Sequence, residues 1–93
     1  MVVALLTLDL FIHASCSLKD KRRVLSGLLD KTKARFNVSI AEVAYQDNHK
    51  RATIAVVCVG CNTSVVQGTL DSVGRLFDAH GEAEVTARTL EFL

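Results

Sequence analysis

Three cysteines and one histidine have a spacing that could support metal chemistry. Cys58 and Cys61 form a C-x-x-C pair, and His13 and Cys16 form an H-x-x-C pair. Thiolates and imidazole nitrogens in such pairs are ligands for zinc, so one hypothesis is a Cys₃His site. The alternative is that the cysteines are packed thiols, because Cys58 shares the phase of the apolar residues before it. We favour packed thiols, and no metal or other cofactor is expected.

A basic stretch between Ser17 and Phe36 suggests a second kind of chemistry. It holds seven Lys and Arg residues against two Asp residues, a net charge of +5, whereas the whole chain carries +1 and the remainder therefore −4. Basic residues clustered on one face match the phosphates of a nucleic acid. The alternative is a solvated helix face that only aids solubility. The candidate nucleic-acid contacts are Lys19, Lys21, Arg22, Arg23, Lys31, Lys33 and Arg35.

Asp9 is the remaining candidate, because it interrupts an apolar stretch. A carboxylate in the middle of a strand must be solvated or paired, and Arg88 or Arg51 could pair with it. A lone carboxylate without a basic partner group and a pocket is not a catalytic site. The sequence also has no phosphate-binding glycine loop, nucleophile elbow or pair of carboxylates. An enzyme is therefore not expected.

The basic stretch is predicted to be an amphipathic helix over 17–36. Ser17 is a suitable N-cap, since its hydroxyl can accept a hydrogen bond from the first turn. Lys21 and Arg22 flank the apolar side of the helix and are expected to direct their charges outward. The apolar stripe that should dock on a sheet consists of Leu18, Leu25, Leu29 and Phe36. Leu28 flanks this stripe.

Strands are predicted wherever apolar residues alternate or run together between polar turns. In the second strand the alternation changes phase, which a bulge near Ile40 would reconcile. A second helix is expected after residue 62, with Gly81 placed to end it. Its buried side should consist of Val66, Leu70, Val73 and Phe77. The four strands are expected over 2–13, 37–45, 51–59 and 84–92.

This order of elements predicts one domain, 1–93, with a ferredoxin-like α+β sandwich. The expected sheet is four-stranded and antiparallel, with both helices on one face. The right-handed crossovers place the first strand beside the third, and we expect this one pair of neighbours to run parallel. His13 and Cys16 would then meet Cys58 and Cys61 at one edge of the sheet.

The sheet face opposite the helices is expected to be open. Val3, Leu5 and Phe11 lie on it, which makes it a possible surface for a homodimer or another protein partner. RNA-binding domains of this fold stack bases on two or three aromatic residues there. Here Phe11 is the only clear aromatic residue and Tyr45 is ambiguous, so we expect RNA recognition through the basic helix instead.

Composition indicates a single globular domain of 93 residues, 49% hydrophobic and without proline. The apolar start lacks a basic segment and a cleavage site, and it is too short to span a membrane. Neither a signal peptide nor a membrane partner is therefore expected. An odd number of cysteines without a secretory signal indicates a reduced, cytoplasmic protein.

Three segments resemble the YlxP-like family of small bacterial proteins. They are CSLKDKRRV at 16–24, ARFNVSIAEV at 34–43 and QD at 46–47, and the resemblance covers essentially the whole chain. It implies a compact ferredoxin-like domain. Genes of this family often lie near those for translation initiation and ribosome maturation factors, which favours structured RNA or the ribosome as a partner. The family has no established catalytic or binding residues, and the three cysteines are not part of its pattern.

Overall fold

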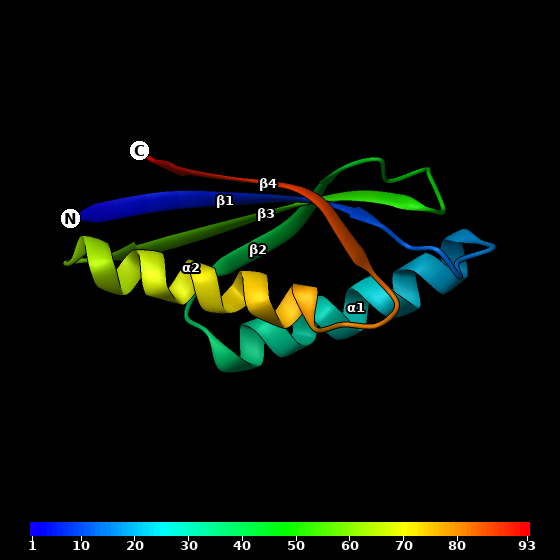
Figure 1. Cartoon of the computed structure of the whole chain (residues 1–93), viewed down its shortest axis with the longest axis horizontal. Helices are drawn as coiled ribbons and strands as arrows, with labels where there is room; N and C mark the ends of the chain where they lie inside the picture. The colour runs from blue at the N-terminus through cyan, green and yellow to red at the C-terminus, as the bar shows by residue number, and fades with distance from the viewer.

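The computed structural model describes all 93 residues and confirms the predicted order of elements (Figure 1). The four strands form one sheet in the order β2-β3-β1-β4, and both helices cover the same face. The chain ends lie together at the end of the sheet away from the β2–β3 turn (Figure 1). The elements are β1 (Val2–Phe11), α1 (Leu18–Arg35), β2 (Ser39–Ala44), β3 (Arg51–Gly60), α2 (Thr63–Asp78) and β4 (Glu84–Phe92).

The core is built by alternation along the two central strands. Successive residues of a strand point to opposite faces of the sheet. In β1 every second residue from Ala4 to Leu10 is buried beneath the helices, and in β3 the same holds from Ala52 to Cys58. α2 closes this core with the four residues predicted for its buried side, and Gly74 joins them.

The central pair of strands runs antiparallel, so the predicted parallel direction is wrong although the neighbours are right. Val2 lies opposite Gly60, and Phe11 lies opposite Arg51. The physical reason is the short β2–β3 turn, which reverses the chain. The α1 crossover makes β2 parallel to β1, so β3 between them must oppose both. The whole sheet is therefore antiparallel.

The helix α1 begins as predicted but buries a different side. The Ser17 hydroxyl accepts a hydrogen bond from the Asp20 N–H, and the Asp20 carboxylate accepts one from the Cys16 N–H. Of the predicted stripe only Leu25 is fully buried, because the stripe is rotated by about 60° from the side that docks. The buried residues of α1 are Lys21, Val24, Leu25, Leu28 and Thr32.

This rotation follows from two polar residues that apolar patterning leaves out. Thr32 is buried because its hydroxyl donates to the Leu28 carbonyl oxygen at 2.8 Å, which satisfies the polar group locally. Lys21 is buried because its ammonium group finds partners on β2 and the turn that follows. Once both are counted, the buried side is continuous from Lys21 to Thr32.

Smaller corrections concern the ends and irregularities of the other elements. The β2 irregularity falls between Glu42 and Ala44, not near Ile40. α2 begins at the Asn62 cap, whose side-chain oxygen accepts from the N–H groups of residues 64 and 65. It ends at Asp78 without a left-handed glycine, so Gly81 does not terminate it. No helix of this protein is long and apolar enough to cross a membrane.

Candidate nucleic-acid interface

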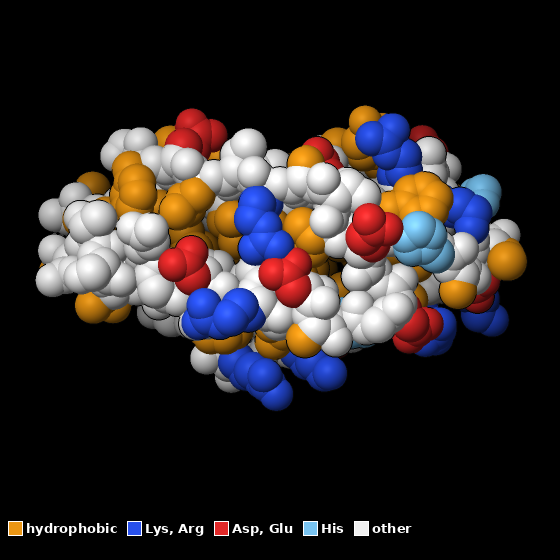
Figure 2. Space-filling view, in the orientation of Figure 1, with side chains coloured by type: hydrophobic (Ala, Val, Ile, Leu, Met, Phe, Trp, Pro, Cys, Tyr) orange, Lys and Arg blue, Asp and Glu red, His pale blue; other side chains and the backbone are white.

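Six of the seven predicted cations lie exposed on α1. Figure 2 shows Lys and Arg side chains gathered along the side of the molecule where α1 lies, below the sheet. At 100° per residue, Lys19, Arg22 and Lys33 fall within about 60° of one another, on the side turned away from the sheet. They span about 21 Å of the helix axis. The exposed cations, here called the basic face, are Lys19, Arg22, Arg23, Lys31, Lys33 and Arg35.

One member of the basic face is engaged in an ion pair. Arg23 donates a hydrogen bond to Glu82 at 2.9 Å, which ties α1 to the loop before β4. The hydrogen bond from Arg23, and then its positive charge, hold the pKa of Glu82 below its ordinary value. Both groups are solvent-exposed, so the pair contributes little to stability. The other five cations have no ion-pair partner.

Lys31 and Arg35 extend the basic face toward α2. They lie one turn apart and line a pocket of about 280 Å³ between α1 and the end of α2. His80 lines the same pocket, and no acidic side chain does. The positive surface of α1 therefore continues into a hollow rather than ending at a neutralising carboxylate.

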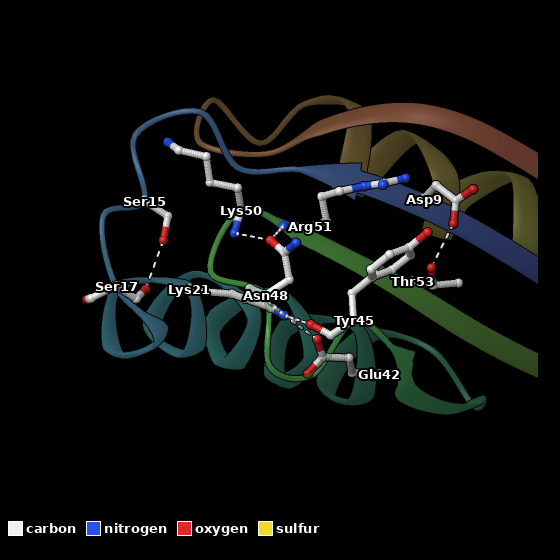
Figure 3. Close-up of polar contacts among 10 residues, drawn as sticks. All are labelled: Asp9, Ser15, Ser17, Lys21, Glu42, Tyr45, Asn48, Lys50, Arg51 and Thr53. Carbon is white, nitrogen blue, oxygen red and sulfur yellow. Dashed lines mark hydrogen bonds and ion pairs between the residues drawn. The ribbon is translucent and has the colours of Figure 1, made fainter.

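Lys21 is buried, so its predicted role as an outward-facing phosphate contact is wrong. Only 1% of the residue is exposed, although its neighbours on either side are solvent-accessible. Its ammonium nitrogen donates to the carbonyl oxygens of Tyr45 at 2.6 Å and Asn48 at 2.7 Å (Figure 3). It also forms an ion pair with Glu42 at 2.7 Å. That enclosed Glu42 oxygen makes no hydrogen bond with any other group, so Lys21 is the charge that neutralises it.

The function of Lys21 is therefore to fix the β2–β3 turn onto α1. The turn is further closed by Asn48, whose side-chain oxygen accepts from the N–H groups of Lys50 and Arg51. Its own N–H donates to the Tyr45 carbonyl oxygen at 3.0 Å. Lys21 and Glu42 come from two of the segments that carry the family resemblance, and the turn contains the third. Those segments thus build one structural contact.

The cysteines and His13 do not converge, and the zinc hypothesis is wrong on geometry. Because β1 and β3 are antiparallel, His13 and Cys16 follow the end of β1 that lies beside Arg51. Cys58 and Cys61 lie at the opposite end of the sheet, beside the start of β1. No three His, Cys, Asp or Glu side chains are grouped as metal ligands. Cys58 is buried as predicted, while the other two thiols are exposed.

Asp9 is paired by a hydroxyl group and not by an arginine. The Thr53 hydroxyl donates to its carboxylate at 2.8 Å, from the neighbouring strand (Figure 3). Arg88 instead forms an ion pair with Asp78 of α2. Arg51 lies over the ring of Tyr45, with its guanidinium carbon 4.3 Å from the ring centroid. Asp9 therefore has a structural partner, as expected, but of a different chemical type.

Two cations outside α1 were not among the predicted contacts. Lys50 directly precedes β3 and Arg51 is its first residue, at the end of the sheet where α1 starts. Lys50 donates to the His13 carbonyl oxygen at 2.8 Å, and its nitrogen lies 6.0 Å from the centroid of the Phe11 ring. The sequence does show this Lys–Arg pair directly after the polar turn. The pair is not part of a larger cluster of basic residues, so the sequence did not mark it as a candidate contact.

The fold and the exposed cations together define a ferredoxin-like α+β domain with one basic helix and one uncovered sheet face. Residues 3–89 match the family model described as "Protein of unknown function (DUF503)". The chain is 32% identical over 84 residues to "Uncharacterized protein YlxP" of Bacillus subtilis (strain 168), covering 90% of this chain and 91% of that protein. This chain therefore belongs to the YlxP-like family, which confirms the resemblance seen in its sequence.

Proposed function

We propose that this protein binds structured RNA, free or within the ribosome, through the basic face of α1. The observation that carries the proposal is the set of five exposed cations on one helix that have no ion-pair partner. The chain as a whole is nearly neutral, with a net charge of +1. A solubilising surface does not require such segregation, whereas an RNA backbone is matched by it.

The position of the cations along α1 supports the same proposal. Lys19 lies in the first turn of α1 and Arg22 just beyond it, and the positive end of the helix dipole disfavours a cation in that turn by about 0.3–1 kcal/mol at low salt. The single carboxylate there, Asp20, accepts a hydrogen bond from the Cys16 N–H just before the helix. A polyanion bound at this end would offset that unfavourable interaction. Phosphates would also gain from the unpaired cations farther along the helix.

The proposal is tested by co-sedimentation with ribosomal subunits and with ribosomal RNA at low and high salt. Two neutralising changes, Arg22→Gln with Lys33→Gln, remove two cations from the outward side of α1. Arg75→Glu is the matched control, because it lowers the net charge by the same two units on α2, where the exposed Arg75 side chain donates a hydrogen bond to Ser72 of its own helix. We expect wild type and control to sediment with RNA at low salt and the double variant to be strongly weakened. Loss of binding in the control and the double variant alike would show a general charge effect and contradict the proposal.

A second candidate function is a homodimer or other protein complex through the open sheet face. The observation that favours it is the apolar half of that face near the chain ends. There Val3 lies opposite Val59, and Leu5 lies opposite Val57, with no helix above them. An uncovered apolar sheet face of this kind is a common protein-interaction surface.

Sedimentation equilibrium distinguishes the two candidates. If the open face forms a dimer, wild type should sediment as twice the chain mass and Val59→Asp as a monomer. Val59 is exposed, so this change should leave the fold intact. A wild-type monomer at every accessible concentration would exclude the homodimer. This result would not bear on RNA binding, which the co-sedimentation experiment tests separately.

A further inference from the structure

Four planar side chains lie in a row across the end of the sheet opposite the chain ends. The Arg51 guanidinium lies over the Tyr45 ring at 4.3 Å. Phe11 is the register partner of Arg51 on the neighbouring strand, so their side chains are adjacent on the open face. The His13 ring meets the Phe11 ring edge-on, with centroids 4.6 Å apart and an interplanar angle of 68°. We call Tyr45, Arg51, Phe11 and His13 the planar row.

Tyr45 is held in place by the contact that buries Lys21. Its backbone has φ of 65°, a left-handed conformation that is unfavourable for a residue with a Cβ atom, and no other residue of this chain has positive φ. The Tyr45 carbonyl oxygen receives hydrogen bonds from Lys21 and from the Asn48 N–H. Figure 3 shows the ring extending from the turn toward Arg51. The turn thus maintains an unfavourable backbone conformation that directs an aromatic ring over a guanidinium group.

The planar row remains available to a partner. Tyr45 is 43% exposed and the His13 side chain is 65% exposed, so neither ring is part of the hydrophobic core. Lys50 supplies a cation beside Phe11. Two carboxylates also face this end, because Asp9 accepts from Thr53 and Glu84 contacts His13. Planar faces flanked by both cations and carboxylates suit nucleobases, which stack and carry N–H and carbonyl groups, better than they suit bare phosphates.

We propose that the planar row is a stacking platform for unpaired bases of single-stranded RNA. This proposal rests on RNA binding by α1 and adds to it a second contact of a different kind. Lys21 connects the two, because it belongs to α1 and fixes the turn that carries Tyr45. An RNA whose helical part lies along the basic face can place a neighbouring single strand across Tyr45 and Phe11. The platform consists of the rings of Tyr45, Phe11 and His13, and the Arg51 guanidinium adds a fourth planar surface.

Tyrosine fluorescence offers a direct test, because Tyr45 is the only tyrosine and the chain has no tryptophan. The two probes are an oligouridine and an abasic oligonucleotide of the same length, which has the phosphates without the bases. We expect oligouridine to bind more tightly than the abasic probe and to quench Tyr45, after correction for absorbance with a free tyrosine derivative. Tyr45→Ala should weaken oligouridine binding roughly 5- to 150-fold, the range for loss of one stacked base. The same change should leave binding of the abasic probe unaltered.

Two conservative variants separate stacking from other roles. Tyr45→Phe keeps the aromatic ring and should retain the affinity for oligouridine. Arg51→Lys keeps the positive charge but removes the planar guanidinium group, and it should weaken that affinity. Equal affinity for the two probes without quenching, or full affinity in Tyr45→Ala, would overturn the platform and leave RNA binding by α1 in place. If structured RNA and both probes all fail to bind at low salt, the proposed function and the platform fail together.

Discussion

Lys21 is the one cation of α1 whose charge has been removed from water. Taking an ammonium group into the interior is costly, and it is tolerated here because two carbonyl oxygens and the Glu42 carboxylate surround it. The three neighbouring cations, Lys19, Arg22 and Arg23, reach solvent from the same two turns. Identical residue types in one short segment therefore serve two purposes, and the angle around the helix decides which.

Replacing Lys21 should destabilise the fold strongly. In Lys21→Met the apolar stem is kept, but the enclosed Glu42 oxygen and two carbonyl groups lose their donor, which should cost about 3–5 kcal/mol. Adding Glu42→Leu should recover part of this loss, since an uncompensated buried charge is then absent. Lys19→Met, an exposed neighbour, should change stability by no more than about 0.5 kcal/mol. Urea denaturation of the four proteins checks this, and equal stabilities for the two Lys→Met variants would contradict the buried role.

At the scale of elements, α1 shows why the docking side of a helix is hard to read from apolar residues alone. The buried side is centred on Leu28, with Val24 and Lys21 before it and Thr32 after it. Lys and Thr belong to this side because their polar atoms find partners in the folded structure. Leu29, which apolar patterning places at the centre, lies at the margin and is only partly buried.

Two alanine substitutions distinguish the two sides of α1. Leu28 is 0% exposed, so Leu28→Ala should cost about 2–5 kcal/mol through lost burial and a residual cavity. Leu29→Ala should cost about 1 kcal/mol, a typical value for a partly buried position. Chemical denaturation measures both free energies of unfolding. If the Leu29 change proved the more costly, α1 would dock through the originally predicted stripe.

The Arg23–Glu82 pair gives the contact between α1 and the β4 loop a pH dependence. Because the pKa of Glu82 is lowered in the folded state, its stabilising effect is complete above the ordinary glutamate pKa. The effect is lost as the pH falls through the lowered pKa. Arg23→Gln should therefore raise the pKa of Glu82 toward its ordinary value, which carboxyl NMR titration can measure. An unchanged Glu82 titration in that variant would show that the ion pair does not form in solution.

At the scale of the whole molecule, the order of elements and the covered face of the sheet could be predicted from sequence. Alternation in β1 and β3 and the spacing in α2 depend on local periodicity, which a sequence displays directly. The direction of β3 relative to β1 could also have been deduced, because the β2–β3 turn is too short for a crossover. The expectation that Cys16 and Cys61 lie close together was wrong because it depended on the parallel direction predicted for β1 and β3. Residue type alone thus indicates which groups can bind metal, while strand direction decides whether they meet.

The candidate site was predictable only in part. Positive charge on the 17–36 segment is visible in the sequence, and six of the seven cations do reach the surface. The burial of Lys21 depends on Glu42 and on a turn 24 to 27 residues away, which helix periodicity cannot show. The planar row likewise depends on strand register and on the backbone of Tyr45. Contacts between distant segments were therefore the part that required the structure.

The salt dependence of RNA affinity tests RNA binding by α1 most directly. Dissociation constants for one structured RNA would be measured by fluorescence anisotropy over a range of salt concentrations. The proteins compared are wild type, the Arg22→Gln, Lys33→Gln double variant and the Arg75→Glu control. We predict that log K falls steeply with log salt for wild type and control. For the double variant the slope should be shallower by about 0.7–0.9 for each phosphate contact removed. Parallel slopes and equal affinities for all three proteins would contradict RNA binding through the basic face.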